Sequence, residues 1–273
     1  MTKTVRCRTI ILCGFLLLVS SCSQVAITGR KQLNLVPDRI MNSISLQSYE
    51  EFLSQNKLSG NVQQAEMVTR VGHRIQRAVE QYAAENNLSN RLQGYQWVFN
   101  LVEDESVNAW AMPGGKVVVY TGLMPIAESE AGLAVVMGHE IAHVIARHGS
   151  ERMTQGLLVE LGGMGLAQAL AKYPDQTKNL FMKSYSIGTQ YGVLLPYSRT
   201  HETEADRMGL IFMAIAGYDP HEAVNFWQRM SAARQLPSPP ELLSTHPADA
   251  TRIRKIKVLM PEAMEYYRTK AEK

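Results

Sequence analysis

The chain has 273 residues, a length that allows one sizeable hydrophobic core or two small ones. Its formal net charge of +3 comes from 28 Lys and Arg residues against 25 Asp and Glu residues. Lys3, Arg6 and Arg8 account for the whole excess, because the first 21 residues contain no acidic side chain. The rest of the chain is electrically balanced, which argues against a nucleic-acid-binding protein.

Residues 1–21 have the pattern of a secretory signal peptide. The three basic residues form its positive start, and residues 10–19 form a short apolar run. That run is too short to cross a bilayer as a permanent helix, so we expect cleavage rather than a retained membrane span.

The chain has three cysteines, Cys7, Cys13 and Cys22, all near its start. The sequence Val-Ser-Ser-Cys, which ends at Cys22, resembles the bacterial lipobox, in which the signal is cut before a cysteine that then carries lipid. An ordinary cleavage site near Ser21 is the alternative, but it would leave a lone thiol in an oxidising compartment. We therefore predict a lipoprotein without disulfides, with a tether over residues 22–37 and one domain over 38–273.

Two helices are predicted at the start of this domain, the first over residues 38–55. The second is clearer, because apolar residues recur at helical spacing. These residues are Met67, Val71, Ile75, Ala78, Val79 and Tyr82. The polar run over residues 85–90 ends the second helix.

The β-branched and aromatic residues that favour strands are concentrated in residues 95–102 and 116–123. Pro-Gly-Gly at 113–115 is a turn signal, so we expect a hairpin that pairs residues 108–112 with 116–120. The proline places this hairpin at a sheet edge. An extended peptide can add to an exposed edge strand as a further strand.

Residues 134–149 contain His139, Glu140 and His143 in the pattern H-E-x-x-H. On a helix, residues four apart lie on the same face, so both imidazoles can point at one spot with the carboxylate beside it. A catalytic zinc site needs such a set, namely two ligands and a base that takes a proton from water. The alternative is a solvated helix that carries two histidines by chance.

The surroundings of the motif favour the metal site. The helix is strongly apolar and should be buried, where unpaired His and Glu side chains are costly. Ser129 and Glu130 have the character of an N-cap and an acidic first turn. Arg147, His148 and Gly149 have the character of a basic last turn and a stop.

The next stretch is less distinctive. Residues 151–173 are again helical and apolar, and residues 174–196 indicate a break followed by a short helix. This second part is either a flap over the site or ordinary packing, and we slightly favour packing.

A zinc ion held by one such helix needs a third protein ligand and one open position for water. Residues 197–210 supply candidates, because Glu202 and Asp206 share a helical face with small residues that allow close approach. The two carboxylates suit a ligand and a supporting group. Glu204 points elsewhere and is expected to be solvated. On pattern alone, an exposed acidic helix with Arg207 as an ion-pair partner is an equally good interpretation.

The C-terminal part adds helices. Residues 218–220 begin one whose face of Ala223, Phe226 and Trp227 belongs to the core. Residues 252–259, "RIRKIKVL", indicate another whose basic side chains are solvated. Four histidines are expected to be surface or core residues rather than ligands: His73, His148, His201 and His221.

Three ordered motifs resemble a known zinc-protease family: "NAWAMPGGKVVVYTGL", "GHEIAHV" and "SRTHETEAD". That family contains HtpX, the CAAX prenyl proteases, the mitochondrial Oma-type proteases and the periplasmic lipoprotein proteases. Its third motif reads S-R-x-x-E-x-x-A-D, and the resemblance implies that Glu202 is the third zinc ligand and Asp206 a supporting residue. HtpX and the CAAX proteases have several membrane spans and this chain shows none, so the soluble envelope branch is the better comparison.

His246 lies in a His-Pro pair that recurs in this branch of the family, close to the active site. A loop imidazole can reach the open zinc position and displace the water, which would hold the enzyme off. Capping of the following helix, or a bond to a neighbouring carboxylate, is an equally good interpretation.

We therefore predict an α+β, predominantly helical fold of the gluzincin type with a small mixed sheet and an edge hairpin. One Zn²⁺ per chain is expected on His139, His143 and Glu202, with Glu140 as the base. The residues expected along the substrate backbone are Asn108, Ala109, Trp110 and Ala111 of the edge strand, continuing to Met112.

The expected function is that of a zinc-dependent endopeptidase of the bacterial cell envelope, acting in quality control on misfolded envelope proteins. The lipid on Cys22 would anchor it, and Ser23 favours the periplasmic face of the outer membrane. One alternative is an envelope chaperone or scaffold with a vestigial metal site, against which the intact Glu140 argues. A metal-dependent hydrolase of non-peptide substrates is the other.

Overall fold

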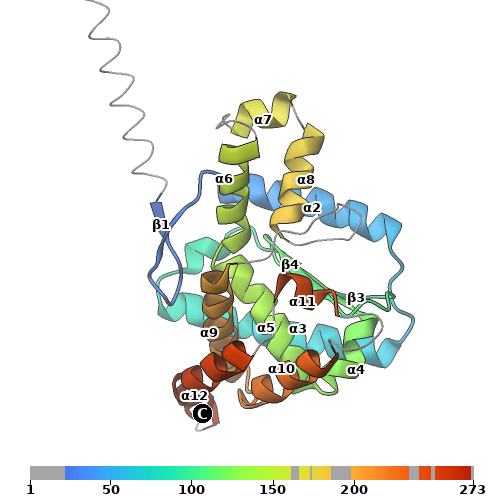
Figure 1. Cartoon of the computed structure of the whole chain (residues 1–273), viewed down its shortest axis with the longest axis vertical. Coiled ribbons are helices and arrows are strands. Elements are labelled where there is room, and N and C mark those ends of the chain that lie inside the picture. The colour runs from blue at the N-terminus through green and yellow to red at the C-terminus, as the bar shows by residue number, and fades with distance from the viewer. Residues whose placement is uncertain are drawn as a thin grey trace, which may run out of the picture.

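The computed structural model describes residues 22–160, 166–172, 174–185, 198–233, 240–246 and 250–271, and the predicted signal peptide lies outside them. The predicted class is confirmed, because helices dominate and the main sheet is small and mixed (Figure 1). The elements are β1 (Cys22–Gln24), β2 (Lys31–Leu33), α2 (Asp38–Gln55), α3 (Val62–Glu85), η1 (Ser89–Leu92), β3 (Val98–Val102), β4 (Ala109–Met112), β5 (Lys116–Tyr120), η2 (Thr121–Leu123), α4 (Met124–Ala127), α5 (Glu130–Ile145), α6 (His148–Glu160), α7 (Leu166–Lys172), α8 (Pro174–Ser184), α9 (Arg199–Ile215), α10 (Glu222–Ala233), α11 (Leu242–Thr245) and α12 (Ala250–Ala271).

The segment predicted to be a tether is folded against the domain. β1 and β2 form an antiparallel hairpin, and Val25 and Val36 are buried in the core. The buried Gln32 donates a hydrogen bond from its side-chain amide to the carbonyl of Ala146, at the end of α5. Residues 23–36 are thus part of the packed structure, while lipid on Cys22 stays a prediction. Among the described residues, no helix is both long enough and apolar enough to cross a membrane.

The three-stranded sheet has the order β3-β5-β4. β3 runs parallel to β5, and β4 pairs with β5 in the predicted antiparallel hairpin, so β4 is an edge strand. Its four side chains are nevertheless all buried. Tyr49 and Phe52 of α2 pack edge-on against Trp110, and α5 packs beside the strand. The predicted edge position is confirmed, and the side chains of the strand are buried against neighbouring helices.

The helix α5 begins as predicted and ends earlier than predicted. The Ser129 hydroxyl accepts a hydrogen bond from the amide of Gly132, which makes it the N-cap. The helix ends at Ile145, because Arg147 adopts the left-handed conformation with a φ of 61°. Gly149 is therefore not the stop but part of the first turn of α6, where its missing side chain leaves room for the ring of Tyr185.

The region after α5 is helical, as predicted. Residues 151–173 contain the rest of α6 and α7, with residues 161–165 outside the described part. α8 starts at Pro174 and packs against α6 and α2, which agrees with the packing interpretation for this half. The rest of the segment for which a flap is the alternative, residues 186–196, lies outside the described residues.

Two glycines allow α5 and α9 to approach each other closely. A Cβ added to Gly209 of α9 would lie 3.0 Å from the backbone nitrogen of His139 and 3.1 Å from the carbonyl carbon of Gly138. The predicted close approach through small residues is confirmed. Because Glu202 lies about two turns before Gly209 on the same helix, this contact brings its carboxylate toward the two histidines of α5.

A side chain at Gly209 is expected to destabilise the fold. In Gly209→Val, the added atoms meet backbone atoms of α5 that cannot rotate away, and overpacking of this kind costs about 1–3 kcal/mol. Chemical denaturation should show a lower midpoint at an unchanged slope. Gly60→Val is the matched control, because Gly60 is exposed and a Cβ there meets nothing within 4 Å. Equal midpoints for the two variants would contradict the importance of this helix contact.

Candidate metal centre

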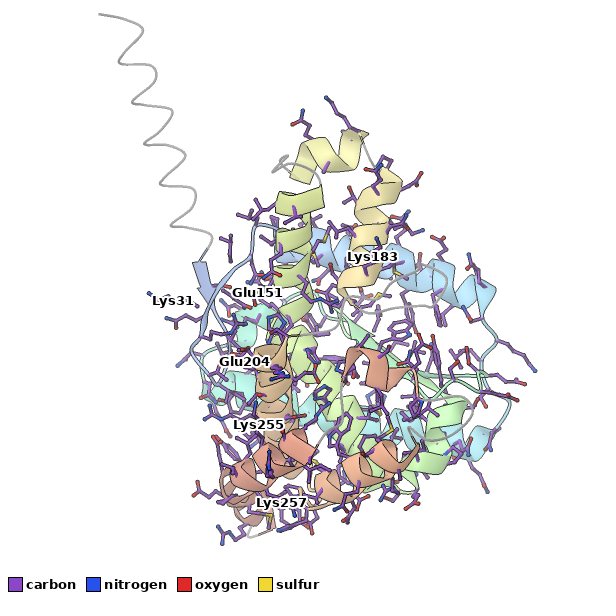
Figure 2. All side chains as sticks on the ribbon, viewed as in Figure 1. Lys31, Glu151, Lys183, Glu204, Lys255 and Lys257 are labelled. Atoms are coloured by element: carbon purple, nitrogen blue, oxygen red, sulfur yellow. The ribbon has the colours of Figure 1, made fainter. Side chains whose placement is uncertain are left out.

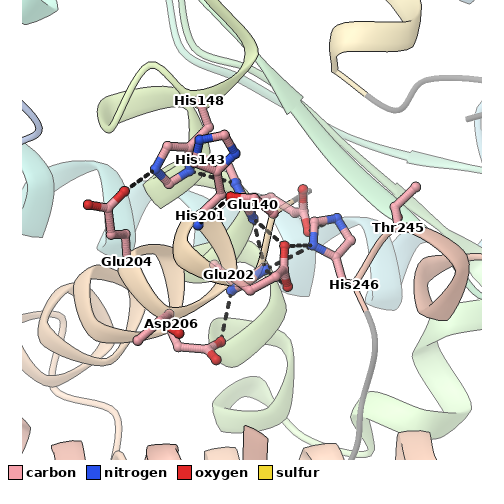
Figure 3. A network of polar contacts seen from close by, with 12 residues as sticks. Glu140, His143, His148, His201, Glu202, Glu204, Asp206, Thr245 and His246 are labelled. Atoms are coloured by element: carbon pink, nitrogen blue, oxygen red, sulfur yellow. Dashed lines mark hydrogen bonds and ion pairs between the residues drawn. The ribbon is translucent and has the colours of Figure 1, made fainter. Parts of the chain in front are cut away.

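Two helices and one short loop bring four candidate ligands to one point. His139 projects from α5. His143 projects from the same helix, Glu202 from the first turn of α9, and His246 from the residue that ends α11 (Figure 3). One nitrogen or oxygen atom from each lies within 4.8 Å of all the others, and all four residues are buried. The structure thus unites the predicted ligand set and adds His246 to it.

The distances within this group fit a zinc ion. The Nε2 atoms of His139 and His143 are 3.1 Å apart, and Nε2 of His143 lies 3.3 Å from Oε1 of Glu202. Nδ1 of His246 lies 3.1 Å from the His139 Nε2 and 2.9 Å from the Glu202 Oε1. Tetrahedral zinc with bonds of about 2.0–2.1 Å needs ligand atoms roughly 3.3 Å apart. The donor set of imidazoles and one carboxylate is also one that zinc accepts.

The protonation states of two ligands suit metal binding. Burial lowers the pKa of His143 well below its usual value, so the ring is neutral and offers a lone pair. Burial alone would raise the pKa of Glu202, but the nearby His246 and Arg252 and its close contacts with both α5 histidines hold it well below its usual value. Glu202 is therefore an ionised carboxylate in a buried position.

Glu140 lies beside this group and not in it. Its Oε1 is 3.6 Å from Nε2 of His246, and that oxygen is buried without a hydrogen-bond partner among the described residues. Burial raises the pKa of Glu140 to about 7. A carboxyl group with such a pKa is suited to take up and release a proton near neutral pH.

Asp206 contacts the first predicted ligand, His139, from the side expected of a supporting residue. Arg252, which the sequence pattern predicts to be solvated, contacts Asp206 in turn. Oδ1 of Asp206 lies 3.1 Å from Nδ1 of His139, so the carboxylate can accept the proton on the ring atom that faces away from the metal. Arg252 donates to both oxygens of Asp206, at 2.6 and 3.0 Å, and lies over the ring of Trp227. The prediction that all basic residues of 252–259 are solvated is therefore wrong for Arg252, because α12 turns its first guanidinium inward.

Glu204 and His148 are buried behind His143, so the prediction of a solvated Glu204 is wrong, while His148 is a core residue outside the group of four. Nδ1 of His148 lies 2.8 Å from Nδ1 of His143, and Nε2 of His148 lies 2.9 Å from Oε2 of Glu204 (Figure 3). Arg30 and Thr28 of the N-terminal hairpin donate to the same carboxylate. The hydrogen bonds that neutralise the buried charge come from a segment more than 170 residues away, which no helical pattern reveals.

The remaining histidines lie outside the group of four candidate ligands. His201 is buried, stacks on His148 and lies with its Nε2 3.1 Å from an oxygen of Glu151. His73 and His221 are exposed.

The strand predicted to bind the substrate backbone lies beside the metal-binding helix, because β4 packs against α5. Asn108, just before it, is buried and accepts a hydrogen bond from the amide of Ala109 through its side-chain oxygen. Binding of a substrate by Asn108, Ala109, Trp110 and Ala111 stays a prediction.

Comparison with known proteins identifies relatives of the whole site. A family profile described as Peptidase family M48 matches residues 70–259, which include every ligand above. The mitochondrial metalloendopeptidase OMA1 of Schizosaccharomyces pombe is 39% identical over 168 residues, which are 61% of this chain and 48% of that protein. OMA1 of Saccharomyces cerevisiae is 32% identical over 200 residues, which are 71% of this chain and 54% of that protein.

A bacterial relative matches over a similar length. The beta-barrel assembly-enhancing protease of Escherichia coli is 32% identical over 160 residues, which are 57% of this chain and 32% of that protein. The chain therefore spans about half or less of the length of these three relatives.

Proposed function

The chain belongs to peptidase family M48, and from that premise we propose that it is a zinc-dependent endopeptidase of the bacterial cell envelope. One observation carries this proposal: the two imidazoles of α5 and the carboxylate of Glu202 converge on one point with the buried carboxyl group of Glu140 beside it. A bound zinc ion would supply Lewis-acid activation of water and of the peptide carbonyl.

The residues of this chain then divide the remaining work. His139, His143 and Glu202 hold the ion, and Asp206 fixes the ring of His139. Glu140 takes a proton from the attacking water and passes it to the leaving amine, so that water is added across the peptide bond. A substrate in extended form would lie along the edge strand β4, whose second backbone edge forms no strand pair among the described residues.

We base the proposed location, the bacterial envelope, on the first 22 residues of the sequence. Relatives include both mitochondrial metalloendopeptidases and a bacterial beta-barrel assembly-enhancing protease, so the family alone leaves the compartment open. The basic start, the short apolar run and the Val-Ser-Ser-Cys that ends at Cys22 favour a bacterial lipoprotein signal. Lipid on Cys22 would hold the enzyme at a membrane, with Ser23 favouring the outer membrane, and misfolded envelope proteins would be its substrates.

The zinc-loaded full chain is expected to cleave an unfolded protein such as casein, to stop when a chelator is added, and to recover with zinc. Zinc at about 1,000 times its Kd should add about 4 kcal/mol of stability, which raises the Tm by roughly 8–16 °C for a domain of this size. His221→Ala, which removes an exposed histidine, is the control for zinc bound elsewhere. Cleavage that continues unchanged in chelator would contradict the proposal.

One observation favours a second function. With His246 included, four protein atoms surround the metal position, and closed shells of four protein ligands are typical of structural zinc. The protein would then be a scaffold or chaperone. The endopeptidase proposal instead requires His246 to leave the group when water binds, so His246→Ala should cleave faster than wild type. One zinc per chain with no cleavage by either protein would favour the scaffold.

A further inference from the structure

A continuous line of buried and partly buried contacts joins the second metal ligand to the N-terminal hairpin. It starts at His143 Nδ1, which lies 2.8 Å from Nδ1 of His148, and continues from Nε2 of His148 to Oε2 of Glu204 at 2.9 Å. Arg30 donates from its Nε to both oxygens of Glu204, at 2.9 and 3.1 Å. The hydroxyl of Thr28 donates to Oε1 of the same carboxylate at 2.8 Å.

The Glu204 carboxylate determines which nitrogen of each histidine carries a proton. The ionised carboxylate of Glu204 can only accept hydrogen bonds, so Nε2 of His148 must carry its proton. The neutral ring of the buried His148 carries one proton only, so its Nδ1 accepts the proton of His143 Nδ1. His143 is then left with a lone pair on Nε2, the atom that faces His139 and Glu202.

Glu204 needs the hairpin to remain an acceptor. Its side chain is 6% exposed, and an unpaired charge at such a position is costly. His148, Arg30 and Thr28 each place a donor against this carboxylate and so stabilise its charge. Arg30 is itself held in place, because its two terminal nitrogens donate to the two oxygens of Glu151 at 3.0 and 2.7 Å.

We propose that the N-terminal hairpin is a working part of the metal centre: Arg30 and Thr28 position Glu204, and Glu204 fixes, through His148, the tautomer in which His143 binds the metal. The inference rests on the proposed zinc site and deepens it. His139 receives the same support directly from Asp206, whereas His143 receives it through one additional imidazole. Arg30, Glu204 and His148 are thus positioning residues, and none of them is among the metal ligands.

The experiment measures the Kd for Zn²⁺ of the full chain by competition with a chromophoric chelator. Glu204→Gln, which keeps the size but removes the charge, should weaken zinc binding by about 10–100-fold, the usual effect of losing a group that orients a ligand. Arg30→Ala should weaken it in the same direction, and Arg30→Lys should restore part of the affinity. The double variant Arg30→Ala, Glu204→Gln should bind zinc no more weakly than Glu204→Gln alone, because both residues act through one carboxylate.

Lys31→Ala is the matched control, because Lys31 is next in the hairpin, is exposed and extends outward, away from Glu151 and Glu204 (Figure 2). It should bind zinc like the wild type. If Arg30→Ala does not fold, Thr28→Val replaces it, because it removes a hydrogen bond to Glu204 at nearly constant volume. Unchanged affinity in Arg30→Ala or Thr28→Val would overturn the proposal. Additive losses in the double variant would also overturn it, since Arg30 would then act independently of Glu204.

A second readout does not respond to general destabilisation. ¹⁵N–¹H spectra of the zinc-loaded protein should show the Nε2–H tautomer of His148 in the wild type and a mixture of tautomers in Glu204→Gln. If His148 of the wild type carries its proton on Nδ1, it donates to His143 instead of accepting from it, and the proposal is overturned. Neither measurement uses a substrate, so the two proposals can fail separately. The variants can leave zinc affinity unchanged in a fully active protease. The zinc affinities can also change as expected in a protein that cleaves no peptide.

Discussion

Glu140→Gln is expected to reduce peptide hydrolysis by about 10²–10⁴-fold, the usual contribution of a positioned general base. The amide keeps the shape of the side chain but cannot take a proton from water. Zinc should stay bound, because Glu140 is not among the four residues that converge on the metal position. Its pKa, which burial raises to about 7, shows that the surroundings already tolerate an uncharged group there, so folding should not suffer.

The measurement is kcat for cleavage of an unfolded protein or peptide, with zinc content determined on the same sample. Glu66→Gln is the matched control, since it makes the same chemical change on the exposed face of α3. A variant with near wild-type kcat would remove Glu140 from the mechanism. If Glu140→Gln restores every phenotype of a deletion strain, hydrolysis is not the function and the scaffold is the better explanation.

The features predicted best from the sequence lie within single helices. His139, Glu140 and His143 are close because four residues make about one turn, and that geometry is independent of the rest of the fold. The same holds for the shared face of Glu202 and Asp206 on α9. To predict that the two helices converge, one further observation is needed. Alanine and glycine recur at helical spacing on α9, and small residues allow close packing of helices.

The features that were missed depend on contacts between distant segments. Arg252 is followed by several basic residues that are solvated, and only Asp206, from another helix, distinguishes it. His148 follows α5 directly, where the sequence pattern indicates its last turn. The left-handed Arg147 instead ends that helix, and the ring of His148, at the start of the next helix, lies against His143. Periodicity describes which residues share a face and carries no information about what faces them.

The hairpin shows the same limit for a whole segment. Residues 23–36 have no periodic pattern, so the sequence indicates a tether. Their place in the structure is decided by a few specific polar contacts, from Arg30 to Glu204 and from Gln32 to Ala146. Such contacts join residues more than 100 positions apart, and a single sequence has no local signal for them.

Glu202→Ala is expected to weaken zinc binding by more than about 100-fold, beyond the effect of losing a group that only orients a ligand, and to abolish hydrolysis. Glu202 supplies the only carboxylate among the four converging residues. Without its negative charge, only imidazoles remain, and the Arg252 guanidinium, whose Nη1 lies 3.1 Å from Oε2 of Glu202, would repel a cation more strongly.

The metal-free protein should lose little stability in Glu202→Ala, because Arg252 keeps its two hydrogen bonds to Asp206 and is not left as an unpaired buried charge. The loss should therefore appear as a Tm that zinc no longer raises. Glu262→Ala is the matched control. It removes a carboxylate of α12 that pairs with Arg207, which lies on the same helix as Glu202, and it should keep the full zinc-induced rise in Tm. If Glu202→Ala still binds zinc as tightly as Glu262→Ala, then His246 is a sufficient third ligand. The predicted ligand set of His139, His143 and Glu202 would then be wrong, because the carboxylate would be dispensable for holding the ion.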